Sequence, residues 1–168
     1  MKVTLAQLTP TIGDIQGNVA KVEKTLSKYS KDSPDLVIFP ELFLVGYPPR
    51  DLLERPSFIA RTQAAIEKLL KISQNFGQTG IVLGAPQLSE KPTGKGIHNS
   101  ALLIYQGELL FTHHKSLLPT YDVFDEPRYF EPGLEHPVVK FKDTILGISV
   151  CEDAWNDPAL WPRRTYHH

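Results

Sequence analysis

Three chemically reactive side chains each follow an apolar stretch that is typical of a buried strand. Glu41 comes one proline after such a stretch, and Lys115 and Cys151 each come directly after one. Ligand crevices in α/β sheets lie at strand ends, so these three side chains could meet in space. A thiol, a carboxylate and an amine together would supply a nucleophile, a base for its proton and a cation for a developing oxyanion.

Each of these residues also has a plainer interpretation. A lone cysteine is often inert core, and a glutamate or lysine is usually solvated. A Cys–His protease would need a histidine near the thiol, and the sequence offers these by type only: His98, His113, His114 and His136. A metal site at His113-His114 is disfavoured because neighbouring strand residues point to opposite faces.

The elements that must position the three residues alternate along the chain. The expected strands are Val3–Leu8, Leu36–Phe39, Ile81–Ala85, Asn99–Tyr105, Glu108–His114, Pro137–Phe141 and Thr144–Val150. One helix is expected to begin at an Asn18 cap, and a longer one at a Ser57 cap, ending near Gly77. Strand, helix, strand, helix, strand and then hairpins predict an α/β layered domain with a mixed sheet.

Composition sets the broad class of the protein. The 168 residues are 41% apolar and 22% charged, with a net charge of −1, which indicates one ordinary globular domain. No apolar run approaches the roughly 20 residues of a membrane span. There is no basic excess, so neither nucleic acid nor an anionic membrane is an expected partner. A single cysteine allows no internal disulfide, so we expect a cytoplasmic protein.

Six short sequence motifs, taken in their order along the chain, carry a resemblance to a known family. They are Leu5-Ala6-Gln7 with Gly13-Asp14 and Asn18, Pro40-Glu41-Leu42, Leu83-Gly84-Ala85-Pro86, His98-Asn99-Ser100-Ala101, His113-His114-Lys115-Ser116-Leu117-Leu118-Pro119, and Gly147-Ile148-Ser149-Val150-Cys151-Glu152-Asp153-Ala154-Trp155. In this order they resemble the nitrilase, or carbon–nitrogen hydrolase, superfamily. The resemblance implies part of an α-β-β-α sandwich with a mixed sheet. It also implies a Glu-Lys-Cys triad, here Glu41, Lys115 and Cys151.

Two further stretches resemble one branch of that superfamily, the glutaminase domain of glutamine-dependent NAD synthetases. They are Gly46-Tyr47-Pro48-Pro49-Arg50-Asp51-Leu52-Leu53 and the run from Leu118 to Phe130. The first could also be only a proline-rich loop anchored in the core. The branch implies a glutamine amidohydrolase that works through a cysteine thioester, with glutamine as the small-molecule partner.

The resemblance assigns a role to individual residues. Cys151 would attack the side-chain amide of glutamine, Glu41 would be the general base, and Lys115 would hold the oxyanion and lower the pKa of the thiol. Glu126 would orient Lys115 as a supporting residue. The positions that match the glutamine pocket are Tyr47, Tyr121, Phe124 and Glu152.

The same resemblance predicts what this chain lacks. We expect residues 1–166 to be the N-terminal portion of a glutaminase domain and 167–168, His167-His168, to be a tag remnant. Amide hydrolysis would need no cofactor and no metal, while ATP and Mg²⁺ would belong to an absent synthetase domain. An open sheet edge would favour a homo-oligomer. Two alternatives stay open: a stand-alone amidase or nitrilase, and a catalytically inactive truncated scaffold.

Overall fold

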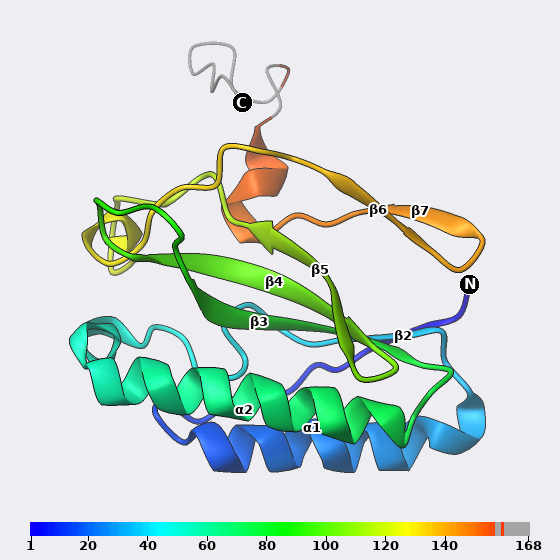
Figure 1. Ribbon diagram of the computed structural model, residues 1–168. Coiled ribbons are helices and arrows are strands. Elements are labelled where there is room, and N and C mark those ends of the chain that lie inside the picture. The colour runs from blue at the N-terminus through cyan, green and yellow to red at the C-terminus, as the bar shows by residue number, and fades with distance from the viewer. Residues whose placement is uncertain (157–158, 160–168) are drawn as a thin grey trace.

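A five-stranded mixed sheet forms the centre of the molecule, in a computed structural model that describes residues 1–156 and 159 (Figure 1). Its strands, in spatial order, are β1 (Val3–Leu5), β2 (Leu36–Ile38), β3 (Gly80–Leu88), β4 (Ile97–Tyr105) and β5 (Glu108–His114). The first three strands run parallel, β4 is antiparallel to β3, and β5 is antiparallel to β4. The mixed α/β architecture expected from the sequence is confirmed.

Two amphipathic helices cover one face of this sheet (Figure 1). They are α1 (Ile15–Tyr29) and α2 (Pro56–Gln74). The buried positions of α1 include Val19, Val22 and Leu26, which recur at helical spacing and so form one apolar stripe. This stripe packs into the main hydrophobic core together with the helix-facing residues of the strands.

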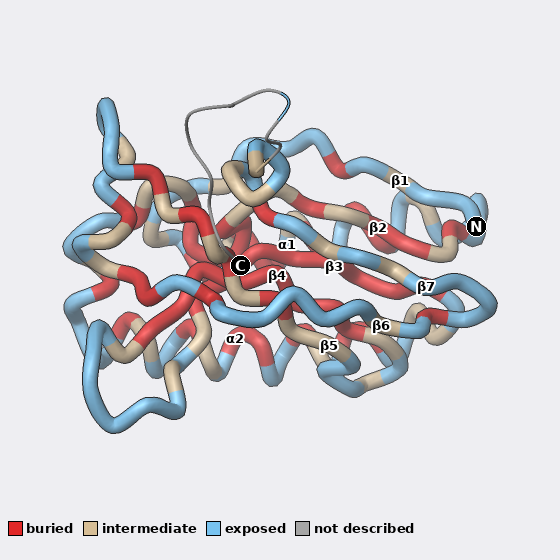
Figure 2. The backbone as a smooth tube through the Cα atoms, turned by 90° about the horizontal axis from the view of Figure 1, so that it is seen from above, coloured by how far each residue is buried: buried red, intermediate tan, exposed pale blue. Residues whose placement is uncertain are grey.

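A two-stranded hairpin lies over the opposite face of the sheet, so the described part of the chain has three layers (Figure 1). The hairpin consists of β6 (Val138–Phe141) and β7 (Thr144–Gly147). Phe141 from β6 packs in a second, smaller core with Leu36, Val82 and Leu103. Because both faces of the central strands are covered, these strands are buried over most of their length (Figure 2).

Both helix starts differ from the sequence-based expectation. The α1 helix is capped by Asp14, whose side chain accepts the Gly17 N–H, and not by Asn18. Asn18 lies inside the helix, fully buried, where its amide bonds the backbone of Thr11 and Leu44. Similarly, α2 begins at Pro56 without a side-chain cap, so Ser57 is not the cap. Proline suits a first helical turn because its missing N–H would have no intrahelical partner there.

The third strand continues beyond the proline that was expected to end it. It runs to Leu88, and Pro86 pairs with Asn99 of β4. The neighbouring strand on the other side, β2, pairs with β3 only as far as Val82. Pro86 therefore has no strand partner on that side that would need its N–H, which is the position where sheets tolerate proline.

The outer elements carry apolar side chains that the described residues do not cover. Leu5 on the edge strand β1 is 66% exposed and Ile145 on β7 is 69% exposed. Strands β1 and β7 are also shorter than the expected Val3–Leu8 and Thr144–Val150. In the described part of the chain, no helix combines the length and apolarity that crossing a membrane requires. The expected tag remnant at 167–168 lies outside the described residues.

Candidate active site

Strand direction brings Glu41 and Lys115 to the same edge of the sheet. Strand β5 is parallel to β2 because each is related to β3 through an even number of reversals, so their carboxyl ends point the same way. Glu41 follows β2 after Phe39 and Pro40, and Lys115 follows β5 directly. Asn99, near the start of the antiparallel β4, lies at this edge too, and its carbonyl accepts the Lys115 backbone N–H at 2.8 Å.

The backbone at Glu41 is held by a close crossing over β3. Leu42 has a left-handed φ of 48°, and the chain there passes directly over Gly84. A Cβ atom at Gly84 would lie 2.1 Å from the Leu42 nitrogen and 2.8 Å from the Glu41 carbonyl carbon. Only glycine fits beneath this crossing. The segment after β2 is thus a tight turn whose side chains at 42–45 are fully buried.

Lys115 is the centre of a buried charged cluster. Its side chain is 0% exposed, and its Nζ atom donates to Glu41 Oε1 at 2.8 Å and to Glu126 Oε1 at 3.0 Å. The second Glu126 oxygen lies 2.9 Å from the same Nζ. Glu126 is itself buried, and the Tyr47 hydroxyl donates to its Oε1 at 2.8 Å. Glu126 thus contacts Lys115, the residue that the resemblance predicts it to orient.

The charges in this cluster shift one another's pKa values. Burial acts to lower the pKa of Lys115, but the negative charges and hydrogen bonds of Glu41 and Glu126 outweigh it, and the pKa is raised. Lys115 is therefore a permanent cation at neutral pH. Burial, with the repulsion of Glu41, raises the pKa of Glu126 despite the opposing effect of Lys115.

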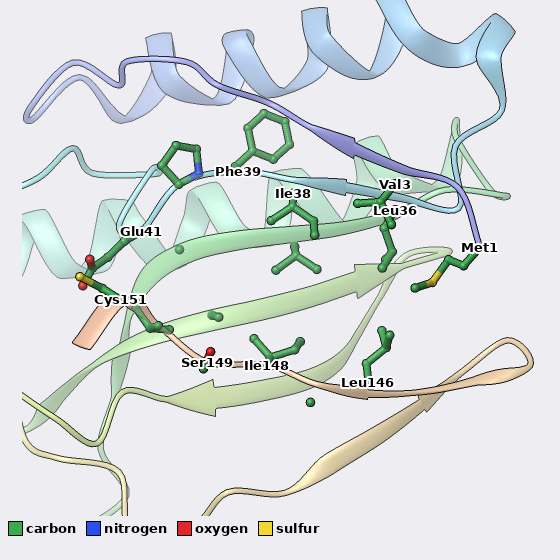
Figure 3. A pocket seen from close by; sticks show the side chains of 16 residues that line it. Met1, Val3, Leu36, Ile38, Phe39, Glu41, Leu146, Ile148, Ser149 and Cys151 are labelled. Atoms are coloured by element: carbon green, nitrogen blue, oxygen red, sulfur yellow. The ribbon is translucent and has the colours of Figure 1, made fainter. Parts of the chain in front are cut away.

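Cys151 reaches this cluster from the other sheet. It is the first residue of a short 3₁₀ turn, Cys151–Trp155, and has a left-handed φ of 46°. Its sulfur lies beside the Glu41 carboxylate, and the two residues line one cavity of about 360 Å³ (Figure 3). The structure therefore brings Glu41, Lys115 and Cys151, predicted from three separate strand ends, to one place.

The pKa of the Cys151 thiol is raised, contrary to the sequence-based expectation. The residue is exposed as a whole, but partial desolvation of the thiol, followed by the negative charge of Glu41, raises its pKa. Lys115 lowers the pKa as expected, yet it is already paired with two carboxylates, so its effect is outweighed. At neutral pH this thiol is protonated and needs a base, and Glu41 is placed to be that base.

The four predicted pocket residues form a connected group that reaches the cluster through Tyr47. The Phe124 ring contacts Tyr47 and Tyr121, with centroid separations of 6.3 and 5.5 Å. The Tyr121 hydroxyl donates to Glu152 at 2.9 Å. Tyr121 and Glu152 also line a second cavity of about 540 Å³. The structure thus brings these residues together beside Cys151, since Glu152 is its neighbour in the chain.

Two residues with close contacts in the site had no predicted role. Asn99 is fully buried, and its Nδ2 donates to Glu41 Oε1 at 2.6 Å. The Asp153 side chain is almost fully buried, and its carboxylate accepts hydrogen bonds from backbone N–H groups beside Lys115 and Cys151. Both residues lie in sequence motifs on which the family resemblance rests, so the sequence did contain a signal for them. The role of each residue could not be predicted from that signal, because the role depends on which atoms the side chain faces.

Three of the histidines are held by Asp153 or by one another. The adjacent His113 and His114 point to opposite faces, as expected: His113 Nε2 lies 3.0 Å from Asp153, while His114 stacks on His98. Burial, together with the charges of neighbouring histidines, lowers the pKa of His114 to about 4. Within residues 1–156 and 159, no cluster of three histidine, cysteine or acidic residues could hold a metal ion.

Comparison with known proteins gives the family. The carbon–nitrogen hydrolase family matches residues 2–161, so this chain belongs to that family and is a carbon–nitrogen hydrolase domain. The glutamine-dependent NAD(+) synthetase of Thermotoga maritima is 42% identical over 156 residues. That match covers 93% of this chain and 26% of the Thermotoga protein. The chain therefore spans about a quarter of the length of this relative.

Solved structures agree with that assignment. The glutamine-dependent NAD+ synthetase of Acinetobacter baumannii, in complex with ADP, superposes with a TM-score of 0.79 at 36% identity. The superposition covers 92% of this chain and 28% of that one. A mutant amidase from Nesterenkonia sp. AN1 superposes with a TM-score of 0.79 at 27% identity, over 95% of this chain and 60% of that one. That structure shows acrylamide added to the amidase's active-site cysteine.

Proposed function

We propose that this chain is the glutamine amidohydrolase part of a glutamine-dependent NAD synthetase, in which it supplies ammonia. The observation that carries the proposal is the Lys115 ammonium, fixed between Glu41 and Glu126 and opposite the Cys151 thiol. The similarity to NAD synthetases at up to 42% identity favours glutamine as the amide. The synthetase chemistry would belong to the rest of the protein.

The first half of the reaction forms a thioester. Glu41 takes the proton of the Cys151 thiol as the sulfur attacks the side-chain carbonyl carbon of glutamine. Lys115 donates a hydrogen bond to the oxygen, which becomes negatively charged in the tetrahedral intermediate. The carbon–nitrogen bond then breaks, and Glu41 returns its proton to the leaving nitrogen, which departs as ammonia.

The second half releases glutamate. Glu41, again ionised, takes a proton from a water molecule that attacks the thioester carbonyl, and Lys115 stabilises the second oxyanion. The carbon–sulfur bond breaks, the product leaves as glutamate, and the proton held by Glu41 returns to Cys151. No metal or cofactor takes part in either half.

The pocket would recognise glutamine by its charged end. A carboxylate such as Glu152 suits the α-ammonium of glutamine, and its hydrogen bond to Tyr121 fixes its direction. Phe124, held between Tyr47 and Tyr121, would form an apolar wall along the side chain of the substrate. The exposed Leu5 and Ile145 further suggest that the protein forms a homo-oligomer through its uncovered apolar surface.

A stand-alone amidase is the second candidate. The superposition covers 60% of the Nesterenkonia amidase chain but only 28% of the Acinetobacter synthetase chain. The same triad would then act on a different small amide. A substrate panel separates the two: hydrolysis of glutamine in preference to acetamide and propionamide supports the first proposal, and the reverse order supports the amidase.

The deciding experiment uses the single thiol. The protein is exposed briefly to acrylamide with and without excess glutamine, and adducts are counted by intact-mass spectrometry, with a denatured, fully alkylated sample as control. We expect one adduct that glutamine blocks. In parallel, ammonia release from glutamine should vanish in Cys151→Ala and persist in Ser27→Ala, an exposed position on α1. An adduct without any turnover would instead support the inactive scaffold.

A further inference from the structure

The carboxylate of Asp153 joins the two segments that carry Lys115 and Cys151. It is 5% exposed and is contacted by four donors. Its Oδ1 accepts the backbone N–H groups of Ser116 and Leu117, both at 2.9 Å. Its Oδ2 accepts the Val150 N–H at 3.1 Å and lies 3.0 Å from His113 Nε2. Both oxygens are therefore fully used.

The four donors flank the two reactive residues. Ser116 and Leu117 directly follow Lys115, and His113 precedes it by two positions. Val150 directly precedes Cys151, so its N–H belongs to the residue adjoining the nucleophile. The lysine segment extends from the five-stranded sheet and the cysteine segment from the two-stranded hairpin. One buried carboxylate thus fixes the distance between parts of two different sheets.

The conformation of Cys151 needs such support. Its φ of 46° lies in the left-handed region, which is strained for a residue that carries a side chain. A residue keeps such a conformation only where its surroundings impose it. The hydrogen bond from Val150 to Asp153 closes the turn around Cys151, because the two residues are three positions apart and the Asp153 N–H also donates to the Val150 carbonyl at 3.1 Å.

We infer that Asp153 is a positioning residue that holds the Cys151 thiol in register with Glu41 and Lys115. The inference rests on the proposed function, since it concerns the geometry of that same site. Asp153 does not touch the reacting atoms. It acts by locking the strained turn of the nucleophile onto the backbone that follows the lysine.

The carboxylate keeps its charge at neutral pH, which this role requires. Burial acts to raise the pKa of Asp153, but the hydrogen bond from His113 and those from the three backbone N–H groups outweigh it, and the pKa is lowered. Hydrogen bonds to a charged acceptor are about twice as strong as neutral ones. An amide in its place would present a donor to groups that are themselves donors.

The test measures how the rate of Cys151 alkylation by iodoacetamide depends on pH, and the midpoint is the pH at which that rate is half its maximum. Asp153→Asn turns one acceptor oxygen into an NH₂ group, so the Ser116 and Leu117 bonds or the Val150 bond must be lost. The thiol would then move away from Glu41 and into water, the two influences that raise its pKa would weaken, and the alkylation midpoint would fall by about half a pH unit or more. The kcat for glutamine should drop about ten-fold or more, with KM nearly unchanged.

Two further variants separate positioning from simple stability. Thr79→Val removes a buried hydrogen bond, to the Pro34 carbonyl, far from the site, and should lower the unfolding temperature while leaving the midpoint unchanged. His113→Leu removes one of the four donors and should shift the midpoint in the same direction as Asp153→Asn, by a smaller amount. If Asp153→Asn does not fold, the His113→Leu result decides.

The inference is overturned if every variant that folds keeps the same pH midpoint of Cys151 alkylation as the wild type. Iodoacetamide needs no turnover, so this measurement stands even if the chain does not hydrolyse glutamine. If the wild type shows no glutaminase activity but Asp153→Asn shifts the alkylation midpoint, the proposed function is refuted and the positioning role stands.

Discussion

Gly84→Ala should misplace the general base without touching any reactive group. The new Cβ atom would lie 2.1 Å from the Leu42 nitrogen and 2.9 Å from the Glu41 Cα. Non-bonded atoms of this kind do not approach closer than 3.0 Å, so the Glu41–Leu42 backbone must retreat by about 1 Å. The neighbours are backbone atoms in a fully buried turn, so no flexible side chain can absorb the displacement.

The expected cost has two parts. Overpacking a buried position costs about 1–3 kcal/mol of stability, so the unfolding midpoint in denaturant should fall but the protein should still fold. A displacement of about 1 Å in a catalytic group costs about 100-fold in rate. We therefore expect ammonia release from glutamine, or acrylamide addition to Cys151 if turnover is slow, to fall by about two orders of magnitude.

Gly77→Ala is the matched control. Gly77 follows α2, and a Cβ atom there would meet only the Gln74 carbonyl at 3.8 Å, an ordinary contact. This variant should keep the wild-type rate. A folded Gly84→Ala protein that reacts within two-fold of Gly77→Ala would refute the conclusion that the crossing over β3 positions Glu41.

Three other measurements test the electrostatics and the surface. Glu126→Gln removes a negative charge that raises the pKa of the Cys151 thiol, so its alkylation midpoint should move to lower pH; a move to higher pH would contradict the cluster described above. The pKa of His114 falls from 6.5 in the unfolded chain to about 4, so protonation favours the unfolded state and stability should be lost as pH falls from 6.5 to 4, with an upper bound of about 3 kcal/mol. His114→Leu should make stability depend less on pH in denaturant titrations, and an unchanged pH dependence would rule His114 out as its source. Leu5→Ser combined with Ile145→Ser should shift the mass from light scattering towards the monomer, whereas a wild-type protein that is already monomeric would end the proposal of a homo-oligomer.

The sequence by itself determined the order of the elements and the types of residue that matter. Within the residues that the structure describes, apolar periodicity located both α-helices and all the strands, because burial on one or both faces leaves a pattern that is local in the chain. The strand-end positions of Glu41 and Lys115 could be read in the same way. Their convergence follows from the parallel direction of β2 and β5, which the two antiparallel pairings of β4 set in the folded sheet.

The ends of strands and the caps of helices were harder to predict from the sequence, for a physical reason. Asn18 has the chemistry of a cap, but its buried amide instead joins α1 to Leu44, 26 residues further along the chain. Pro86 would end a strand in isolation, yet β3 continues because its partner on that side stops at Val82. In both cases a distant segment decides the outcome, and local preference cannot anticipate it.

The tertiary structure alone decided how the site is held together. Nothing in the spacing of residues 115 and 151 shows that the two sheets lie against each other with a thiol beside a carboxylate. The hydrogen bond from Asn99 to Glu41, the three donors that residues 113–117 offer to Asp153 and the glycine beneath the Glu41 turn all join residues that are distant in the chain. Such contacts depend on packing across layers. The net direction of the thiol pKa depends on the same packing, because the burial and the two carboxylates that outweigh Lys115 come together only in the folded chain.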